Sequence, residues 1–253
     1  MQAELQELAV STAAQEESLQ REWFFDPPPE VLQSRIFAAG GYFVVSGLFD
    51  DAMLDALRAE AETARPEGVR QFLSESDGIE GRGGSPARSF RSGRGRDLHW
   101  GLHGSPEMKD RLKQLCGVTA TPTGSGSFSY YEQPGDFLAL HRDILQCDMA
   151  VITCLSARAG EGPTGELTVY PGFMREPLSS ARAAGRHCGT VIRLERGHTA
   201  VLLGGLVPHE VTPTCAGQER IVAINCFRIE CDLAKKPPTA ETLPEEAFEA
   251  SCR

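Results

Sequence analysis

One histidine and one aspartate near the middle of the chain have the spacing of metal ligands. His141 and Asp143 stand two residues apart at the end of the apolar run FLALHRD. Residues i and i+2 of a strand point to one face, so we expect both side chains to project together, with Phe137 and Ala139 on the same side. An imidazole and a carboxylate in this arrangement suit a divalent cation of intermediate hardness. The pair alone is a weak signal, because a chain with six histidines and 35 acidic residues contains about one such pair by chance.

His209 supplies a third ligand from a distant part of the chain. It lies 68 residues after His141 and follows an apolar strand and a Gly-Gly turn in LLGGLVPHEVTP. Two ligands on one strand and a third across a barrel occupy one face of a metal ion and leave three positions open. The spacing therefore predicts an open three-ligand site.

Arg220 follows His209 by 11 residues, after a stretch that is typical of a hairpin connection. We expect it on the neighbouring strand, with Val222 and Ile224 on its face. A guanidinium inside an apolar face requires an anionic partner, since a buried unpaired charge is costly. The partner is either a bound dicarboxylate or an acid of the chain such as Glu210 or Glu219.

Other residues offer competing assignments. His187 precedes Arg196 by nine residues but lies in a polar turn, and His198 opens a strand with no arginine at the required distance. His99 and Trp100, in DLHWGLHG, are candidate substrate contacts, although a packing role is the more common one for such histidines.

The four-part pattern resembles the Fe(II)/2-oxoglutarate-dependent dioxygenase superfamily, whose members carry His-x-Asp, a distal His and an Arg about ten residues later. The segment YYEQPGDFLALHRD is similar to the prolyl-hydroxylase-like branch, which often has a tyrosine at the position of Tyr131. The resemblance covers about residues 36–230. It departs from the pattern at Val222, where many members carry Ser or Thr. Asp143 disfavours the halogenating branch, which replaces this carboxylate.

The resemblance implies that His141, Asp143 and His209 hold Fe(II), while Arg220 and Tyr131 bind 2-oxoglutarate. It implies an O2-dependent oxidation of an unactivated C–H bond, by hydroxylation or a related reaction, coupled to conversion of 2-oxoglutarate to succinate. The expected substrate is a small molecule such as an amino acid or a natural-product intermediate. Three alternatives stay open: a peptidyl or protein hydroxylase, a catalytically silent metal- or ligand-binding barrel, and a non-iron cupin-type site.

The elements that must position these residues fall into two halves. After residue 117 about eight short apolar runs are separated by Gly, Pro and polar turns, which is typical of an all-β barrel or sandwich. The resemblance implies a mainly β fold with supporting helices (α+β), a double-stranded β-helix (jelly-roll, cupin-like) core packed by N-terminal helices. We expect one domain over 1–253, with mainly helical support in 1–116, the jelly-roll core in 117–232 and a C-terminal tail in 233–253.

The first half contains several helix patterns. Caps, prolines and helical periodicity predict helices over 3–22, 27–40, 50–64 and 105–116, and a short strand over 41–49. Residues 78–97 hold six glycines and five arginines, which predicts a loop. That loop is either a mobile insertion or a lid that recognises an anion. Arg88 and Arg94 within it are candidate substrate contacts, which makes an anionic or carrier-protein-tethered substrate our expectation.

Composition limits the class of protein. The 253 residues are 41% hydrophobic with a net charge of −10, which indicates a globular chain and disfavours nucleic-acid binding. No apolar run is long enough to span a membrane, and the acidic, polar N-terminus lacks the features of a secretory signal, so we expect cytoplasmic residence and no membrane partner. The eight cysteines contain no CxxC pair, which favours buried free thiols. The sequence gives no indication of oligomeric state.

Overall fold

The computed structural model describes residues 27–79, 82, 84–158 and 165–231. Its helices are α2 (Pro29–Leu32), α3 (Arg35–Ala38), α4 (Asp51–Ala64), α5 (Asp97–Gly104), α6 (Pro106–Cys116), α7 (Leu178–Ala184) and the short 3-10 turns η1 (Arg65–Glu67), η2 (Pro171–Phe173) and η3 (Arg186–Cys188). Its strands are β1 (Tyr42–Ser46), β2 (Val69–Leu73), β3 (Arg88–Arg94), β4 (Ala120–Tyr131), β5 (Phe137–His141), β6 (Met149–Arg158), β7 (Leu167–Val169), β8 (Thr190–Ile192), β9 (His198–Leu202), β10 (His209–Val211) and β11 (Glu219–Ile229).

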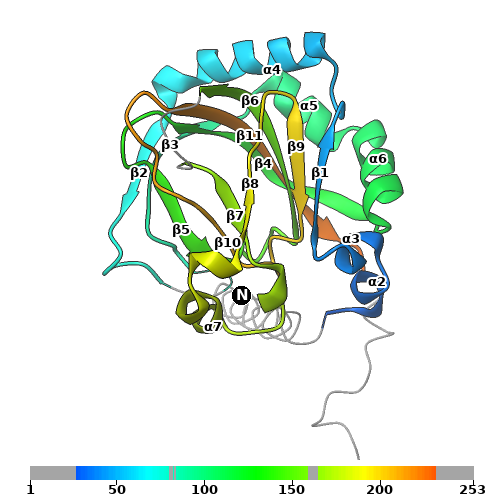
Figure 1. Cartoon of the computed structure of the whole chain (residues 1–253). Coiled ribbons are helices and arrows are strands. Elements are labelled where there is room, and N and C mark those ends of the chain that lie inside the picture. The colour runs from blue at the N-terminus through cyan, green and yellow to red at the C-terminus, as the bar shows by residue number, and fades with distance from the viewer. Residues whose placement is uncertain (1–26, 80–81, 83, 159–164, 232–253) are drawn as a thin grey trace, which may run out of the picture.

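The strands form one antiparallel sheet that curls on itself (Figure 1). The order is β1-β9-β6-β11-β4-β3-β5-β10-β7-β8, and β2 pairs with β3 at the side. Strands that are far apart in the chain therefore become neighbours, as β4 and β11 do. Each of the eight runs expected after residue 117 forms one of the strands β4 to β11, and the predicted mainly β, jelly-roll fold with supporting helices is confirmed.

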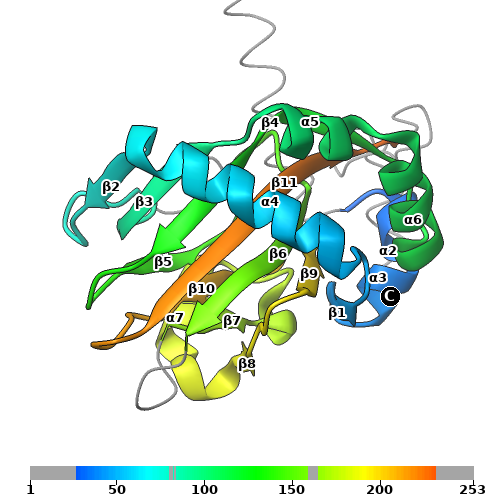
Figure 2. The same cartoon turned by 90° about the horizontal axis from the view of Figure 1, so that it is seen from above.

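Helices cover the outer face of the sheet. In Figure 2, α4 lies obliquely across the strands. Its Leu54, Leu57 and Ala61 are buried against Phe128 and Tyr130 of β4, because apolar residues at helical spacing form one stripe. The Asp50 side chain accepts a hydrogen bond of 2.8 Å from the Met53 backbone N–H and so begins this helix where the sequence predicts.

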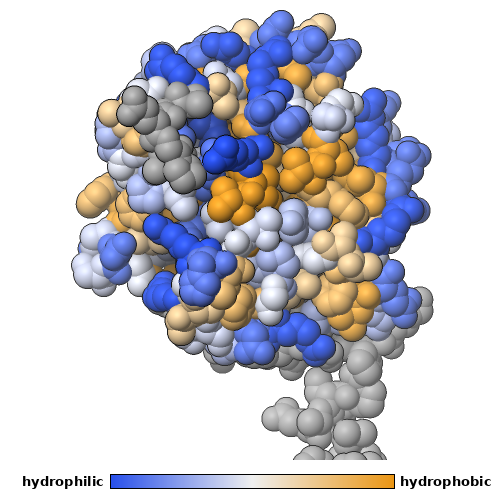
Figure 3. All heavy atoms as spheres, in the orientation of Figure 1, coloured by the Kyte–Doolittle hydropathy of each residue, from blue (hydrophilic) through white to orange (hydrophobic). Residues whose placement is uncertain are grey.

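The larger apolar core lies between the two ends of the sheet and the helices α2, α3 and α6. Fully buried side chains from β6 and β9, such as Met149, Val151 and Val201, pack together with Leu112 of α6. On the surface, apolar side chains gather in the middle of the face shown in Figure 3, over β8 and β9. Val191 of β8 has 52% of its surface exposed.

Residues 27–116 carry the strands β1, β2 and β3 beside their helices. The predicted strand over 41–49 is β1, and the helices predicted over 50–64 and 105–116 are α4 and α6. The loop predicted over 78–97 is wrong for its second half. Residues 88–94 form β3, which lies between β4 and β5 in the sheet. The sequence pattern did not reveal this strand, because β3 carries arginines and serines on both faces. Polar side chains on both faces remove the alternation of apolar and polar residues that predicts a strand.

Other predicted segments differ from the structure or lie outside the described residues. The helix predicted over 27–40 is two short helices, α2 and α3, separated by Ser34, whose side chain caps α3. Helix α7 lies in a segment that the sequence suggests is a polar turn. The helix predicted over 3–22 and the tail over 233–253 lie outside the described residues. Among the described residues, no helix combines the length and apolarity needed to cross a bilayer.

A disulfide joins Cys147 to Cys226, whose Cα atoms are 5.0 Å apart. The prediction of free thiols is therefore wrong for these two cysteines, although Cys116 and Cys154 are buried free thiols as expected. The pairing had no spacing signal, because it depends on β11 lying beside the start of β6 and not on separation along the chain. It ties the segment after Asp143 to the strand that carries Arg220.

Removing the disulfide should destabilise the protein. The bond closes a loop of 79 residues, and loss of such a cross-link costs about 2–5 kcal/mol of unfolding free energy. We expect this loss for the double substitution Cys147→Ala and Cys226→Ala, measured by urea denaturation under oxidising conditions. Cys188→Ala, which removes an exposed thiol, should unfold like the unmodified protein. An equal midpoint for the double variant and the unmodified protein would contradict the cross-link.

Candidate functional site

Pairing between β5 and β10 brings the two predicted histidine ligands face to face. His141 and His209 are register partners, and their ring centroids lie 4.2 Å apart. The next aligned pair is Leu138 with Val211, so β5 has one more residue than β10 in this interval and forms a bulge. Because of the bulge, Leu138 shares the inner face with His141. The predicted position of Phe137 and Ala139 on that face is wrong, since both line a cavity on the outer face.

Asp143 completes a compact group with the two histidines. One oxygen of its carboxylate, Oδ1, lies 3.6 Å from Nε2 of His141 and 3.6 Å from Nε2 of His209. Ligand atoms held about 2.1 Å from one divalent ion lie roughly 3–3.5 Å apart, which is close to these distances. Within the described residues, these three form a group of metal-ligating type whose donor atoms all lie within 4.8 Å of one another. The predicted convergence of 141, 143 and 209 is therefore present.

Both imidazoles are oriented by their second nitrogen. Nδ1 of His141 lies 2.9 Å from the carbonyl oxygen of Ala139, and Nδ1 of His209 lies 2.9 Å from that of Val207. A carbonyl only accepts hydrogen bonds, so Nδ1 carries the proton in each ring and Nε2 keeps its lone pair. Metal-bound histidines commonly have this second hydrogen bond. The chain thus presents two lone pairs and a carboxylate to the same point.

Gly204 makes room for Asp143, and sequence reasoning missed this role. The Asp143 backbone N–H donates to the Gly204 carbonyl over 2.8 Å. A Cβ atom on Gly204 would lie 1.8 Å from Oδ2 of Asp143, well inside van der Waals contact. That Oδ2 atom is buried and has no hydrogen-bond partner among the described residues. The signal in the sequence is the Gly-Gly pair that precedes His209.

Burial and neighbouring groups shift the pKa values of His141 and Asp143. Burial lowers the pKa of His141, and the neighbouring His209 lowers it further, so the ring is held neutral. Burial alone would raise the pKa of Asp143, but His209 and His141 outweigh it and lower this pKa below its usual range. A neutral His141 and an ionised Asp143 are the protonation states in which these two groups bind a divalent cation.

Arg220 lies on the inner face of β11, but its predicted place on the strand next to that of His209 is wrong, because β11 pairs with β4 and β6 and not with β10. Neither acid weighed as its partner contacts it. Glu210 instead accepts hydrogen bonds from Tyr170 and Arg186 on the outer face, and Glu219 pairs with Arg65. Arg220 is 5% exposed, and its Nε and Nη1 atoms have no hydrogen-bond partner among the described residues. The Glu166 carboxylate is close enough to interact with Arg220 through its charge, but no carboxylate of the described residues lies within 4.0 Å of the guanidinium. A buried cation in this state favours binding of an external anion.

An apolar wall surrounds Arg220. Its guanidinium carbon lies 5.0 Å from the centre of the Tyr131 ring, and this ring stacks on Phe90 with centroids 5.3 Å apart. Tyr131 is the register partner of Arg220, so both side chains point to the inside. Burial raises the pKa of Tyr131 to about 12, which keeps its hydroxyl protonated as a donor.

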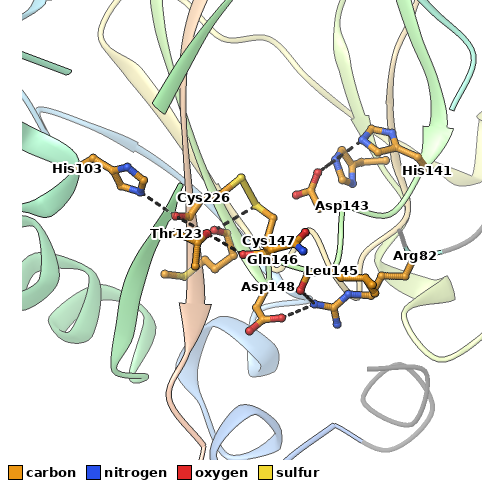
Figure 4. The surroundings of a disulfide bond; sticks show 12 residues. Arg82, His103, Thr123, His141, Asp143, Leu145, Gln146, Cys147, Asp148 and Cys226 are labelled. Carbon is orange, nitrogen blue, oxygen red and sulfur yellow. Dashed lines mark hydrogen bonds and ion pairs between the residues drawn. A yellow bond between two sulfur atoms is a disulfide. The ribbon is translucent and has the colours of Figure 1, made fainter. Parts of the chain in front are cut away.

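The segment that follows Asp143 is held in place by a disulfide, an ion pair and a backbone hydrogen bond. Figure 4 shows His141 and Asp143 beside the disulfide of Cys147, with Arg82 close to Asp148. Arg82 forms an ion pair with Asp148, and both side chains are at most 10% exposed. The Asp148 carbonyl also accepts from the Gly205 N–H over 3.2 Å, next to Gly204. None of these contacts was predicted, since they join three separate parts of the chain.

The predicted substrate residues occupy different positions. Arg88 is on the inner face of β3, as register partner of Leu138. Arg94 is exposed, with its guanidinium carbon 4.6 Å from the centre of the Trp100 ring, which is 40% exposed. His99 is 1% exposed and stacks on Phe128, whose side chain packs under α4 on the outer face. This position favours a packing role for His99 and does not favour a substrate contact.

The competing histidine–arginine pair does not come together. His187 is exposed in η3, whereas Arg196 pairs with Asp51 and Asp55 of α4.

A cavity of about 500 Å³ lies apart from the triad. It is on the outer face of β5, between Phe137, Ala139 and the residues of α7, and none of the three candidate ligands lines it.

Comparisons with known proteins agree with this fold. A scan against protein-family models and a search of curated sequences found no match. Among solved structures, the α-ketoglutarate-dependent epimerase SnoN from nogalamycin biosynthesis matches with a TM-score of 0.58 and 16% identity, over 85% of this chain and 81% of its own. HygX from Streptomyces hygroscopicus, solved with nickel, 2-oxoglutarate and hygromycin B, matches with a TM-score of 0.55 and 12% identity, over 83% and 92%.

A prolyl-4-hydroxylase from Pseudomonas putida matches with a TM-score of 0.50 and 20% identity, over 77% of this chain and 96% of its own. At sequence identities this low, structural similarity shows that the proteins share a fold and shows nothing more. The resemblance predicted from the sequence is therefore confirmed at the level of the fold, and the arrangement of the site must support the chemistry.

Substituting Gly204 should disable the metal site without unfolding the protein. In Gly204→Ala the new Cβ displaces the Asp143 carboxylate, so we expect affinity for Fe(II) or its substitute Ni²⁺ to fall at least 10-fold in anaerobic calorimetry. Gly101→Ala is the matched control, because a Cβ there meets no atom within 4 Å. Equal metal affinity in both variants would refute the packing argument.

Acid should destabilise the metal-free protein through His99. Burial lowers the pKa of His99 in the folded protein to about 4, whereas its pKa in the unfolded chain is about 6.5. Between these two pH values His99 is protonated in the unfolded chain but not in the folded protein. Stability therefore falls as the pH falls through this window, by about 3 kcal/mol for this group. We expect His99→Asn to reduce the slope of unfolding free energy against pH, and the exposed His187→Asn to leave it unchanged. An unaltered slope in His99→Asn would count against the assignment.

Proposed function

We propose that this protein is an Fe(II)- and 2-oxoglutarate-dependent oxygenase that oxidises an unactivated C–H bond of a small molecule, most simply by hydroxylation. One observation carries the proposal. His141, Asp143 and His209 converge on one point of an inner wall that also holds the buried Arg220, which has no acidic partner within 4.0 Å among the described residues. A metal site alone has several uses, but a metal site that shares its inner wall with such a guanidinium suits a dicarboxylate cosubstrate.

The donor set fits ferrous iron. Two neutral imidazole nitrogens and one carboxylate oxygen form the facial triad of non-haem Fe(II) oxygenases, which leaves positions for other ligands. When bound, the iron supplies the activation of O2 by oxidative decarboxylation of 2-oxoglutarate to succinate. The carbonyls of Ala139 and Val207 keep both rings in the orientation that ligation needs.

Arg220 binds the far carboxylate of 2-oxoglutarate in this proposal. Its guanidinium is already buried and oriented over Tyr131, so little side-chain entropy is lost on binding. The protonated Tyr131 hydroxyl is the candidate second donor, since Val222 supplies none where many relatives of this fold carry Ser or Thr. The Tyr131 ring and Val222 on the same face of β11, both 2% exposed, exclude water and strengthen the ion pair.

The structural neighbours support a small-molecule substrate. HygX was solved with hygromycin B and SnoN acts in nogalamycin biosynthesis, and both match with higher TM-scores than the prolyl-4-hydroxylase. We therefore favour an amino acid or a natural-product intermediate, free or tethered to a carrier protein, and cytoplasmic action. A catalytically silent barrel is less consistent with an unsatisfied Arg220, and hydroxylation of peptides in a library would favour the peptidyl alternative.

The direct test is anaerobic titration of the protein with Fe(II) and then 2-oxoglutarate. A weak visible absorption band at equimolar 2-oxoglutarate reports chelation to the iron, and succinate formed after admission of O2 reports turnover. We expect both. If 2-oxoglutarate bound without any succinate under all substrates tried, the silent barrel would replace the oxygenase.

Replacing Arg220 should weaken the binding of 2-oxoglutarate without weakening the binding of the metal. In Arg220→Gln the lost charge-assisted bidentate pair is worth about 2–3 kcal/mol, which corresponds to a 30- to 150-fold rise in Kd for 2-oxoglutarate. Affinity for the metal should stay within threefold. Arg228→Gln, an exposed arginine on the same strand, is the matched control and should change neither constant. Equal 2-oxoglutarate affinity in the two variants would remove Arg220 from the cosubstrate site.

A further inference from the structure

Arg88 is a second arginine on the inner wall, and its register fixes its direction. It pairs with Leu138 across β3 and β5, and Leu138 packs with Tyr131 and Val211 on the inside. Its neighbour Arg91 pairs with Tyr130 and faces outward, toward the helices. Side chains alternate along a strand, so Arg88 and Phe90 both project to the inside.

The guanidinium of Arg88 points back along β3, toward the end of β5 that carries His141. Strands β3 and β5 are antiparallel, and the Ala139 N–H donates to the Ala87 carbonyl, so residues before 87 lie beside residues after 139. Nη1 of Arg88 donates to the Pro86 carbonyl over 3.1 Å and reaches Ser85 Oγ at 3.5 Å. The charged end of the side chain therefore lies on the His141 side of its own Cα atom.

Arg88 differs from the other arginines of its segment. Arg82 pairs with Asp148, Arg91 with Glu132 and Arg96 with Glu67. Arg94 rests on Trp100 at the surface. No carboxylate of the described residues lies within 4.0 Å of the Arg88 guanidinium. A half-buried cation with carbonyl and hydroxyl contacts alone is favourably placed to accept an anion.

We propose that Arg88 recognises a carboxylate of the substrate, so that the substrate is a small anionic molecule with an apolar body. The inference rests on the proposed function and names its substrate class. Arg220 is the cosubstrate residue, and Arg88 is separated from it by β4, with Phe90 and Tyr131 between them. A single guanidinium matches the single charge of a carboxylate, whereas a phosphate dianion calls for more cations. The neighbouring Leu138, Val211 and Phe90 suit a hydrocarbon portion held near the triad.

The test compares small carboxylic acids with their primary amides. A panel of amino acids and aliphatic acids, each beside its amide, is titrated by anaerobic calorimetry into protein with Fe(II) and 2-oxoglutarate, and into protein without them. We expect at least one acid to bind 10-fold or more tightly than its amide. Arg88→Gln should remove that preference, and Arg88→Lys should restore part of it.

The controls separate this inference from the proposed function. Arg88→Gln should leave the Kd for 2-oxoglutarate within twofold, and Arg91→Gln, on the opposite face of the same strand, should leave acid binding unchanged. Three results would each overturn the inference: no acid of the panel binds, amides bind as well as acids, or Arg88→Gln weakens 2-oxoglutarate as much as Arg220→Gln does. A failure to bind Fe(II) and 2-oxoglutarate would instead refute the proposed function, and the acid–amide comparison on the protein alone would still decide the role of Arg88.

Discussion

The ladder between β5 and β10 is the interaction on which the candidate site depends. It places His141 opposite His209, so that two ligands separated by 68 residues share one point in space. A slip of one residue in β10 would turn Glu210 inward and His209 outward. That slip is costly because Glu210 would lose Tyr170 and Arg186, which satisfy its carboxylate on the outer face. The packing of the outer face thus protects the register of the inner one.

Charge is distributed unevenly between the two faces of the sheet. On the outer side, arginines and acids satisfy one another, as Arg91 and Glu132 do. On the inner side, Arg88 and Arg220 lack acidic partners within 4.0 Å among the described residues, while Asp143 faces the imidazoles of His141 and His209. The wall therefore holds an anion where a divalent cation is favoured and cations where anions are favoured. This arrangement lowers the stability of the empty protein and favours binding of charged ligands.

Contacts from three separate parts of the chain hold the short connection after β5 in place. Cys147 is bonded to Cys226 of β11, Asp148 pairs with Arg82, and Gly204 holds the backbone of Asp143. Asp143 lies just beyond the end of β5, where no ladder restrains it, so other contacts must fix its position. Precise ligand geometry on a loop requires such support, since loops are otherwise the most mobile part of a fold.

The sequence alone determined the eight strands after residue 117, the helices α4 and α6, and the identities of His141, Asp143, His209 and Arg220. Alternating apolar runs, caps and ligand spacing are local properties, and local patterns specify them. Tertiary structure decided which face each residue occupies, because the bulge at residues 139–140 shifts the alternation and moves Phe137 outward. It also decided that Gly204 must lack a side chain, that Cys147 meets Cys226, and that His99 packs outside the barrel. Each of these depends on segments far apart in the chain coming together, and no local pattern encodes that distance.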